Sequence, residues 1–212
     1  VFLSMPAAVV LFFFRTAIVQ TLFQSGAFSS ESTALVAAPL GFLAAGLVGY
    51  ALVEALTRAF YAMHDTRTPV IAGIAIIVLN VAMGAALLDR MGYLALALSL
   101  SVSTTVEALI LIAVLRGRLG DMSPRAWHWL LRALGATVLT AVAAYLLSGP
   151  LTEATTPGVG PRLQQLLVVV IALGAVGAVF LISAWMLHLQ ELFTTIDLVS
   201  RRVPPLRGLF AR

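Results

Sequence analysis

The chain has 212 residues, of which 61% are hydrophobic and only 10% are charged, and its mean hydropathy is +1.04. Soluble domains carry about 25% charged residues, so this composition excludes an ordinary soluble protein. The formal net charge of +4 comes from arginines scattered through short loops, which offer no basic face to nucleic acid, and the absence of cysteine excludes disulfides and thiolate metal sites.

Six apolar runs follow one another along the chain, and about 20 helical residues are enough to cross a bilayer. Lipid offers no partner for backbone N–H and C=O groups, so each run must be a helix or a strand of a closed barrel. The runs lack the two-residue alternation of barrel strands. The predicted fold class is therefore an all-α membrane protein with about six transmembrane helices. These helices are expected at residues 1–23, 33–61, 69–88, 92–115, 130–147 and 163–189.

Arginine is distributed unequally between the two sets of loops. Arg67, the segment 116–125 and the C-terminal tail carry most of it. Because Lys and Arg concentrate on the cytoplasmic side of membrane proteins, these segments and the C-terminus are predicted to be cytoplasmic. The chain also begins with Val inside an apolar run, which we interpret as a cut through a longer polypeptide. The predicted outward loops are residues 26–32, 89–92 and 148–162.

Two helix boundaries and one surface helix can be predicted from local sequence. Thr68 followed by Pro69 is typical of an N-cap with Pro at the first helical position. Gly149 and Pro150 predict the end of a helix. Residues 190–212, with apolar residues at helical spacing and several arginines, predict an amphipathic helix on the cytoplasmic membrane surface.

A few ionisable and polar residues interrupt the predicted spans, where such groups usually face a polar interior. Glu54 and Arg58 are four residues apart, the favourable order for an ion pair, and Glu107 is predicted at a similar depth on another helix. We therefore expect Glu54, Arg58 and Glu107 to border a polar vestibule open to the cytoplasm. The alternative is that Arg58 reaches the lipid head groups and the carboxylates are neutralised locally. Ser103 lies on the same helical face as Glu107.

Asn80 lies in the middle of the third predicted span and needs a partner there, either a residue of another helix or an ion or substrate. Arg15 interrupts the first run and either reaches outward or lines the same interior. A stripe of small residues recurs every four positions in the second run and predicts a close helix contact, either static or sliding. The stripe consists of Ala37, Gly41, Ala45 and Gly49.

No arrangement of residues typical of an enzyme is found in the sequence. His64, His128 and His188 are far apart, and there is no phosphate-binding loop or nucleophile motif. We therefore expect a protein that is not an enzyme and has no cofactor.

Two stretches carry a family resemblance. Residues 21–28, TLFQSGAF, resemble the LFxxGxF segment of the MurJ/MviN family. Residues 56–70 contain RAFYAMHDTRTP, which is similar to that family's R-x-F-Y-A-x-x-D-T-[RK]-T-P signature. The resemblance implies part of a fourteen-helix flippase of the MOP exporter superfamily, with this chain similar to helices nine to fourteen. It also implies the bacterial plasma membrane as the location.

The resemblance further implies a division of the chain. Residues 1–118 would form part of the C-terminal lobe with four transmembrane helices, and residues 119–189 two additional helices with a groove for a lipid tail. The family's cavity arginines for pyrophosphate lie before this segment. Asn80 matches one ligand of a sodium site described in relatives, but Gly84 and Leu98 stand where the other ligands would be, so no metal site is predicted.

The implied function is transport of lipid II, the undecaprenyl-linked precursor of peptidoglycan, to the outer leaflet by alternating access. Expected partners are that lipid, membrane lipids and proteins of cell-wall synthesis or division. Asp65 and Arg67 would then either pair across a cytoplasmic gate or, for Asp65, cap a helix end. The alternatives are a MATE-like exporter of small cations and a membrane scaffold that does not transport.

Overall fold

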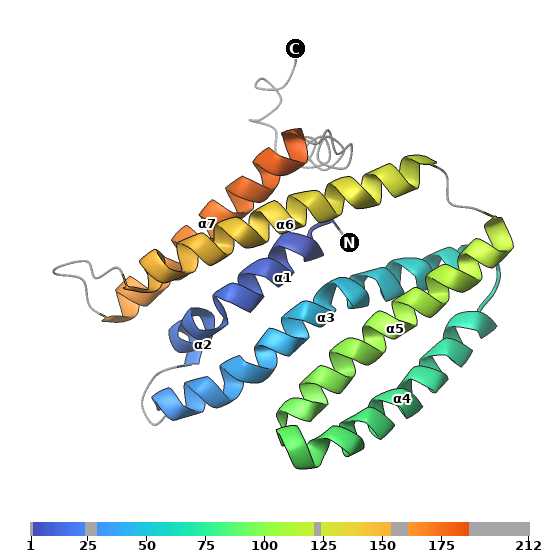
Figure 1. The fold of residues 1–212 in the computed structure, drawn as a ribbon, viewed down its shortest axis with the longest axis horizontal. Coiled ribbons are helices and arrows are strands. Elements are labelled where there is room, and N and C mark those ends of the chain that lie inside the picture. The colour runs from blue at the N-terminus through green and yellow to red at the C-terminus, as the bar shows by residue number, and fades with distance from the viewer. Residues whose placement is uncertain (1, 24–28, 121–123, 154–160, 187–212) are drawn as a thin grey trace.

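The computed structural model describes residues 2–23, 29–120, 124–153 and 161–186. These residues form seven helices and the short turns between them (Figure 1). The all-α fold expected from the sequence is confirmed. Residues 190–212, for which an amphipathic helix is predicted, lie outside the described residues. The helices are α1 (Ser4–Phe13), α2 (Arg15–Phe23), α3 (Ser30–Ala62), α4 (Arg67–Met91), α5 (Leu94–Leu119), α6 (Pro124–Glu153) and α7 (Pro161–Met186).

The length of the first apolar run predicted a single helix over residues 1–23, but the run forms two helices. It breaks at Phe14, and α1 and α2 meet at an angle of 79°. The Nη1 atom of Arg15 donates a hydrogen bond to the Phe12 carbonyl oxygen at 2.6 Å, which satisfies an acceptor that the break frees. Apolar length alone could not reveal a bend that depends on one charged side chain turning back onto the backbone.

Helices α3 and α5 approach each other closely because glycines of α3 face hydroxyl residues of α5. A Cβ atom at Gly46 would lie 2.7 to 2.9 Å from Ser101, and one at Gly49 would lie 3.1 Å from the Thr105 hydroxyl. Ser101 also donates a hydrogen bond to the Phe42 carbonyl oxygen at 2.7 Å. The predicted four-residue stripe is therefore only partly a helix contact, because Ala45 within it is exposed.

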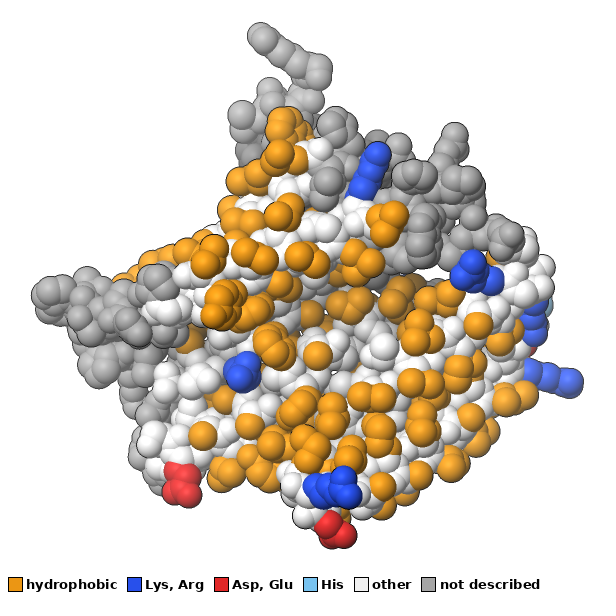
Figure 2. Space-filling view, in the orientation of Figure 1, with side chains coloured by type: hydrophobic (Ala, Val, Ile, Leu, Met, Phe, Trp, Pro, Cys, Tyr) orange, Lys and Arg blue, Asp and Glu red, His pale blue; other side chains and the backbone are white. Residues whose placement is uncertain are grey.

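Helix α4 packs against α5 on one side and is exposed on the other (Figure 1). Its exposed side chains are large and aliphatic, as expected for a surface that faces lipid. Figure 2 shows the same composition over much of the visible face, with most charged side chains near helix ends. The exposed aliphatic residues of α4 include Val70, Ile71, Ile74, Ile77, Val78 and Val81.

Helices α6 and α7 pack against each other and against α1, which lies between them and α3 (Figure 1). The contact is apolar: Val9, Val10 and Phe14 meet residues of both α6 and α7. Helix α6 continues through Gly149 and Pro150 to Glu153, so the predicted helix end at these two residues is wrong. Proline removes one backbone hydrogen bond from the helix, and only three residues of α6 follow Pro150.

Among the described residues, four helices are long and apolar enough to span a membrane: α3, α4, α5 and, within α6, Leu131–Gly149. The bent pair of α1 and α2 adds a fifth candidate. In α7 the apolar stretch among the described residues is the shorter Val169–Ser183, so the sixth span stays a prediction.

Candidate functional site

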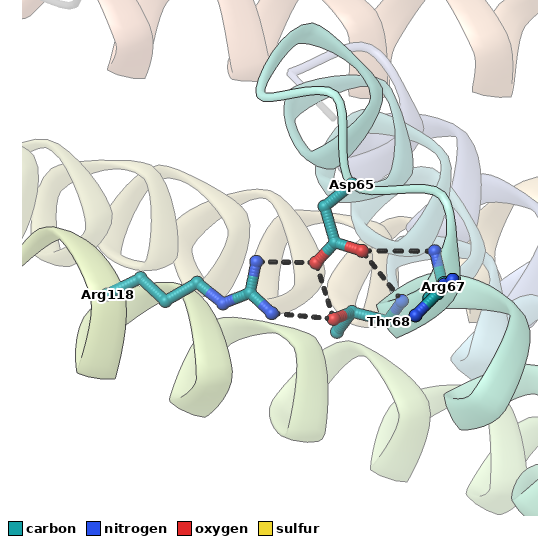
Figure 3. A network of polar contacts seen from close by, with 4 residues as sticks. All are labelled: Asp65, Arg67, Thr68 and Arg118. Atoms are coloured by element: carbon teal, nitrogen blue, oxygen red, sulfur yellow. Dashed lines mark hydrogen bonds and ion pairs between the residues drawn. The ribbon is translucent and has the colours of Figure 1, made fainter.

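The turn between α3 and α4 is built around Asp65 (Figure 3). Its Oδ1 atom accepts hydrogen bonds from the backbone N–H groups of Arg67 at 3.0 Å and Thr68 at 3.1 Å. Its Oδ2 atom accepts the Thr68 hydroxyl at 2.5 Å. Asp65 therefore caps α4, which is one of the two roles predicted for it. The helix begins at Arg67 with Thr66 as its N-cap residue, so the predicted N-cap at Thr68 and helix start at Pro69 are wrong. The acid supplies partners for amides that have none within the helix.

Arg118, near the end of α5, joins this turn from a distance of about fifty residues in the chain (Figure 3). Its Nη1 atom lies 2.5 Å from Asp65 Oδ2, and its Nη2 atom donates to the Thr68 hydroxyl oxygen at 2.8 Å. The guanidinium also lies over the ring of the fully buried Phe60, 5.6 Å from its centroid. We name Asp65, Thr68 and Arg118 the turn clamp, because they tie α3, α4 and α5 together at one end.

These contacts favour the charged form of Asp65. The hydrogen bonds from Thr68 contribute most, and Arg118 adds a hydrogen bond and an opposite charge; together they lower the pKa of Asp65 to about 2. The turn therefore carries a carboxylate at any physiological pH.

The sequence left two roles open for these residues: a pair of Asp65 and Arg67 across a cytoplasmic gate, or a cap of a helix end by Asp65. In the structure the ion partner of Asp65 is Arg118, and the contact recorded between Asp65 and Arg67 is with the Arg67 backbone. Sequence reasoning treated Arg118 only as a loop charge. The turn motif offered no signal for it, because the approach depends on how α5 packs beside α4.

Between α4 and α5 a line of polar residues runs through the membrane span. Ser99 donates a hydrogen bond to Asn80 Oδ1 at 2.8 Å, so Asn80 makes an interhelical bond, one of the two roles expected of it. A Cβ atom at Gly84 would lie 3.3 Å from the Ser99 hydroxyl, so α4 and α5 approach each other closely at this point. Asn80 Oδ1 thus accepts at least one hydrogen bond from another helix.

Ser103 and Glu107 continue this line along α5. The Ser103 hydroxyl is buried and has no hydrogen-bond partner among the described residues. Glu107 is half-buried, and its Oε1 atom lies 3.7 Å from where a Cβ at Gly73 of α4 would stand. Within the part of the chain that the structure describes, no ion pair involves Glu107. Glu107 is therefore directed at α4.

Glu54 and Arg58 form the predicted ion pair on α3. Both side chains are largely exposed, 67% for Glu54 and 77% for Arg58. The exposed Tyr50 and Tyr61 lie on the same face of the helix. No hydrogen bond or ion pair among the described residues joins Glu107 to this pair, so a shared vestibule of the three stays a prediction.

The described residues hold no group of three or more His, Asp or Glu side chains that could bind a metal ion. His64 lies in the turn with a positive φ of 59°. His128 and His188 fall outside the residues whose side chains are described.

Apolar spans, polar residues inside them and a charged turn at one end define part of a multi-helix membrane protein. The family model described as Lipid II flippase MurJ matches residues 1–159, which include both sequence motifs. The chain belongs to the MurJ family, and the resemblance of its motifs is confirmed.

Individual relatives agree with this assignment. The Lipid II flippase MurJ of Burkholderia cenocepacia is 32% identical over 140 residues, which cover 66% of this chain and 27% of the relative. The Probable lipid II flippase MurJ of Rhizobium meliloti is 36% identical over 159 residues, or 72% of this chain and 30% of that protein. The chain thus spans less than a third of the length of these relatives.

A solved structure titled Lipid II flippase MurJ, inward closed conformation, has the same fold over 84% of this chain and 36% of its own, with a TM-score of 0.64 and 21% sequence identity. The partial coverage fits the prediction of a portion of a larger helical transporter. The numbering of the helices as nine to fourteen stays a prediction.

Proposed function

We propose that this chain is part of a flippase that moves lipid II from the cytoplasmic to the outer leaflet of a bacterial plasma membrane for cell-wall synthesis. The observation that carries the proposal is the family match over residues 1–159. The relatives bear the name of that activity, and the chain shares their family and fold.

The physical demand on such a protein is to shield a charged, sugar-bearing head group while its lipid tail stays in the membrane. An unpaired diphosphate in apolar surroundings would cost many kcal/mol, and a polar cavity between two lobes that opens alternately to each side avoids this cost. In this proposal, residues 1–118 are part of one lobe and residues 119–189 form the groove for the tail. The apolar contact of α6 and α7 with α1 supports the second assignment.

The turn clamp supports a rigid role for α3, α4 and α5 within that lobe. With Asp65 held by Arg118 and Thr68, the exposed Arg67 is the charge left to meet an opposite lobe at a cytoplasmic gate. Glu54 and Arg58 would lie at the entrance of the cytoplasmic vestibule, with Ser103 and Glu107 deeper on α5. The arginine-rich loops and the C-terminus would be cytoplasmic, where proteins of cell-wall synthesis or division could bind.

One observation favours a second candidate, an exporter of small cations. Glu107 is an intramembrane acid without an ion partner among the described residues, and exporters of cations need such a group. Transport of a labelled organic cation by the native protein, lost in Glu107→Gln, would favour this candidate.

The deciding experiment uses the native protein that contains this chain, reconstituted in liposomes with fluorescent lipid II. The proposal expects lipid II to become accessible on the other leaflet, with slower movement in Arg58→Ala and Glu107→Gln at unchanged protein stability. Arg90→Ala, which removes an exposed arginine at the opposite end of α4, is the matched control and should flip normally. If the native protein moves no lipid II, the proposed function is wrong; a scaffold would give that result.

A further inference from the structure

Glu107 carries an acidic group inside the membrane-spanning part of α5, the helix that lies between α3 and α4 (Figure 1). It lies about 20 Å along the helix axis from Leu94 at the start of α5 and about 13 Å from Arg116 near its end. Its side chain is half-buried, and its Oε1 atom lies 3.7 Å from where a Cβ at Gly73 of α4 would stand. The carboxylate therefore lies against the space that a glycine leaves between the two helices.

No opposite charge faces this acid among the described residues. Helix α4 carries no titratable side chain between residues 68 and 88. On α3, the other helix packed against α5, the charged residues Glu54 and Arg58 are exposed and are paired with each other, and Tyr50 and Tyr61 are exposed as well. A charge at membrane depth is costly and is normally paired with another residue or with a ligand. The carboxylate therefore needs a positive partner that the described helices do not supply.

A buried hydroxyl one turn away on the same helix also lacks a partner. The side chain of Ser103 is 0% exposed, and its Oγ atom makes no hydrogen bond among the described residues. Three other hydroxyls of α5 donate to the carbonyl oxygen four residues earlier in the helix: Ser101 at 3.0 Å and Thr104 and Thr105 at 2.8 Å. Serine in any helix can make such a bond, but Ser103 does not. A buried polar atom without a protein partner is a sign that an ion or a water molecule binds there.

The helix places both groups on the face of α5 that α4 covers. Ser99, four residues before Ser103, donates a hydrogen bond to Asn80 of α4. Glu107, four residues after Ser103, lies against Gly73 of the same helix. Ser103 lies between these two contacts, about 6 Å along the axis from Glu107, and side chains of a helix lean toward its N-terminus. The Glu107 carboxylate therefore leans toward the Ser103 hydroxyl.

We propose that Glu107 and Ser103 form a binding site for a monovalent cation within the membrane span. The carboxylate supplies the negative charge, and both side chains supply the oxygen ligands that a hard cation prefers, at about 2.3–2.6 Å from the ion. A cation can reach the carboxylate because Glu107 is only half-buried, and the buried Ser103 provides a ligand inside the protein. Asn80, which is bonded to Ser99, is not part of this site. Two cations carry the required chemistry, the sodium ion and the proton.

The test measures cation binding to the native protein that contains this chain, purified in detergent. A ligand that binds the native state raises the unfolding temperature, so this temperature is the readout, and it does not depend on lipid II flipping. In one series sodium chloride replaces choline chloride at constant ionic strength. In a second series without sodium, the pH is varied from about pH 5 to about pH 8. A third series adds tetraphenylphosphonium, an organic cation.

Two variants remove the proposed ligands: Glu107→Gln and Ser103→Ala. Three matched controls change groups of the same kind elsewhere. Asp89→Asn removes an exposed acid at the far end of α4, and Ser183→Ala removes a buried hydroxyl that is bonded within its own helix. Asn80→Leu removes the neighbouring polar group that is bonded to α5.

We expect the cation to raise the unfolding temperature of the native protein and Glu107→Gln to abolish this effect. Ser103→Ala should weaken the cation affinity about fivefold, the loss that follows from one neutral hydroxyl ligand. All three controls should respond like the native protein. A sodium effect that requires Glu107 identifies sodium as the ligand, and a pH effect that requires Glu107 without a sodium effect identifies the proton. If both effects require Glu107, the two cations compete for the site.

The proposal is overturned if Glu107→Gln responds to sodium and to pH as the native protein does, or if Asp89→Asn loses the response equally. Loss of the response in Asn80→Leu with a native response in Ser103→Ala would place the cation at Asn80 and also overturn it. Stabilisation by tetraphenylphosphonium alone would overturn it, because the ligand would then be an organic cation. If Glu107→Gln fails to fold, a native response in Ser103→Ala is the overturning result.

The site stands independently of the proposed function, because it requires only that a cation reach Glu107. A native protein that binds the cation through Glu107 but does not flip lipid II would contradict only the proposed function. A native protein that flips lipid II but whose cation response is unchanged in Glu107→Gln would contradict only the cation site.

Discussion

Two of the helix contacts in this fold are held together by different interactions. Between α3 and α5, Gly46 and Gly49 let the backbones approach, and Ser101 forms a hydrogen bond to a backbone carbonyl of the other helix. Between α1, α6 and α7 the contact is made by alanine, valine and phenylalanine side chains without hydrogen bonds among them. Its buried residues include Ala133, Ala136, Ala144, Ala172, Val176 and Phe180.

This difference indicates which helices are held in one relative position and which can shift against each other. A glycine contact with a directional hydrogen bond is satisfied in a single register, and the turn clamp fixes the same helices a second time at their end. An apolar contact without hydrogen bonds between its side chains has no directional bond to lose when one helix shifts along another. We therefore expect α3, α4 and α5 to move as one unit and the α1, α6 and α7 contact to absorb relative motion.

The largest expected effect breaks the α3–α5 contact directly. Gly46→Ala places a Cβ within 2.9 Å of the Ser101 backbone, which cannot move aside, so we expect a destabilisation of about 1–3 kcal/mol. Thermal unfolding in detergent measures it.

The matched control is Gly117→Ala on α5, where an added Cβ meets nothing within 4 Å. Alanine favours a helix by up to about 1 kcal/mol over glycine, so this control should be neutral or stabilising. A Gly46→Ala protein as stable as Gly117→Ala would show that α3 and α5 are not held by close approach.

The next effect concerns the turn clamp. Arg118→Ala removes the ion pair with Asp65, the hydrogen bond to Thr68 and the contact with the Phe60 ring. We expect a loss of about 1 kcal/mol, at the low end for bonds to charged groups because the arginine side chain is 46% exposed. Arg116→Ala, two residues away and exposed, should unfold at the native temperature. An equal loss of stability in both variants would show that the turn clamp does not help to hold α3, α4 and α5 together.

The charge of Asp65 gives that clamp a pH dependence. Its pKa falls from 3.8 to about 2 on folding, so the stabilisation is complete above about pH 4 and is lost as the pH falls toward 2. The unfolding temperature of Asp65→Asn should therefore lie below that of the native protein at neutral pH. The difference between the two unfolding temperatures should become smaller below about pH 4. A difference that stayed constant down to about pH 2 would contradict the stabilising role of the Asp65 carboxylate.

The sequence predicted the four spans in α3, α4, α5 and α6, because apolar length decides whether a segment can leave water, and length is local information. It missed the break at Phe14, since that depends on Arg15 folding back onto the Phe12 carbonyl. It also misplaced the end of α6, which continues for three residues beyond Pro150.

The candidate site was predicted less completely. Glu54 with Arg58 was found because its spacing is set by the helix itself, and Asp65 was found from its motif. Arg118 was missed because its approach to Asp65 depends on how α5 packs beside α4. Contacts within one helix can be predicted from the spacing of residues in the sequence, whereas contacts between helices can be predicted only when the packing of the helices is known.

A smaller effect on stability is expected for the hydrogen bond between Asn80 of α4 and Ser99 of α5, within the unit formed by α3, α4 and α5. Asn80 and Ser99 should show a coupling of about 0.6 kcal/mol in a double-mutant cycle of Asn80→Leu and Ser99→Ala, the average for such bonds within membranes. The matched cycle of Asn80→Leu with Ser103→Ala should be additive, because Ser103 shares no hydrogen bond with Asn80. Coupling of equal size in both cycles would assign the effect to general packing.

The smallest stability effect is expected at the Glu54–Arg58 pair, which lies within α3 and joins it to nothing else among the described residues. An exposed pair at this spacing contributes about 0.3–0.5 kcal/mol, so Arg58→Gln should unfold within about 2 °C of the native protein. A loss of flipping by this variant at nearly native stability would then locate function on the exposed face of α3, away from the contacts that hold the unit together. A large loss of stability would instead show that the Glu54–Arg58 pair is part of the rigid unit. The distinction between the structural pair Asp65–Arg118 and the functional pair Glu54–Arg58 would then be wrong.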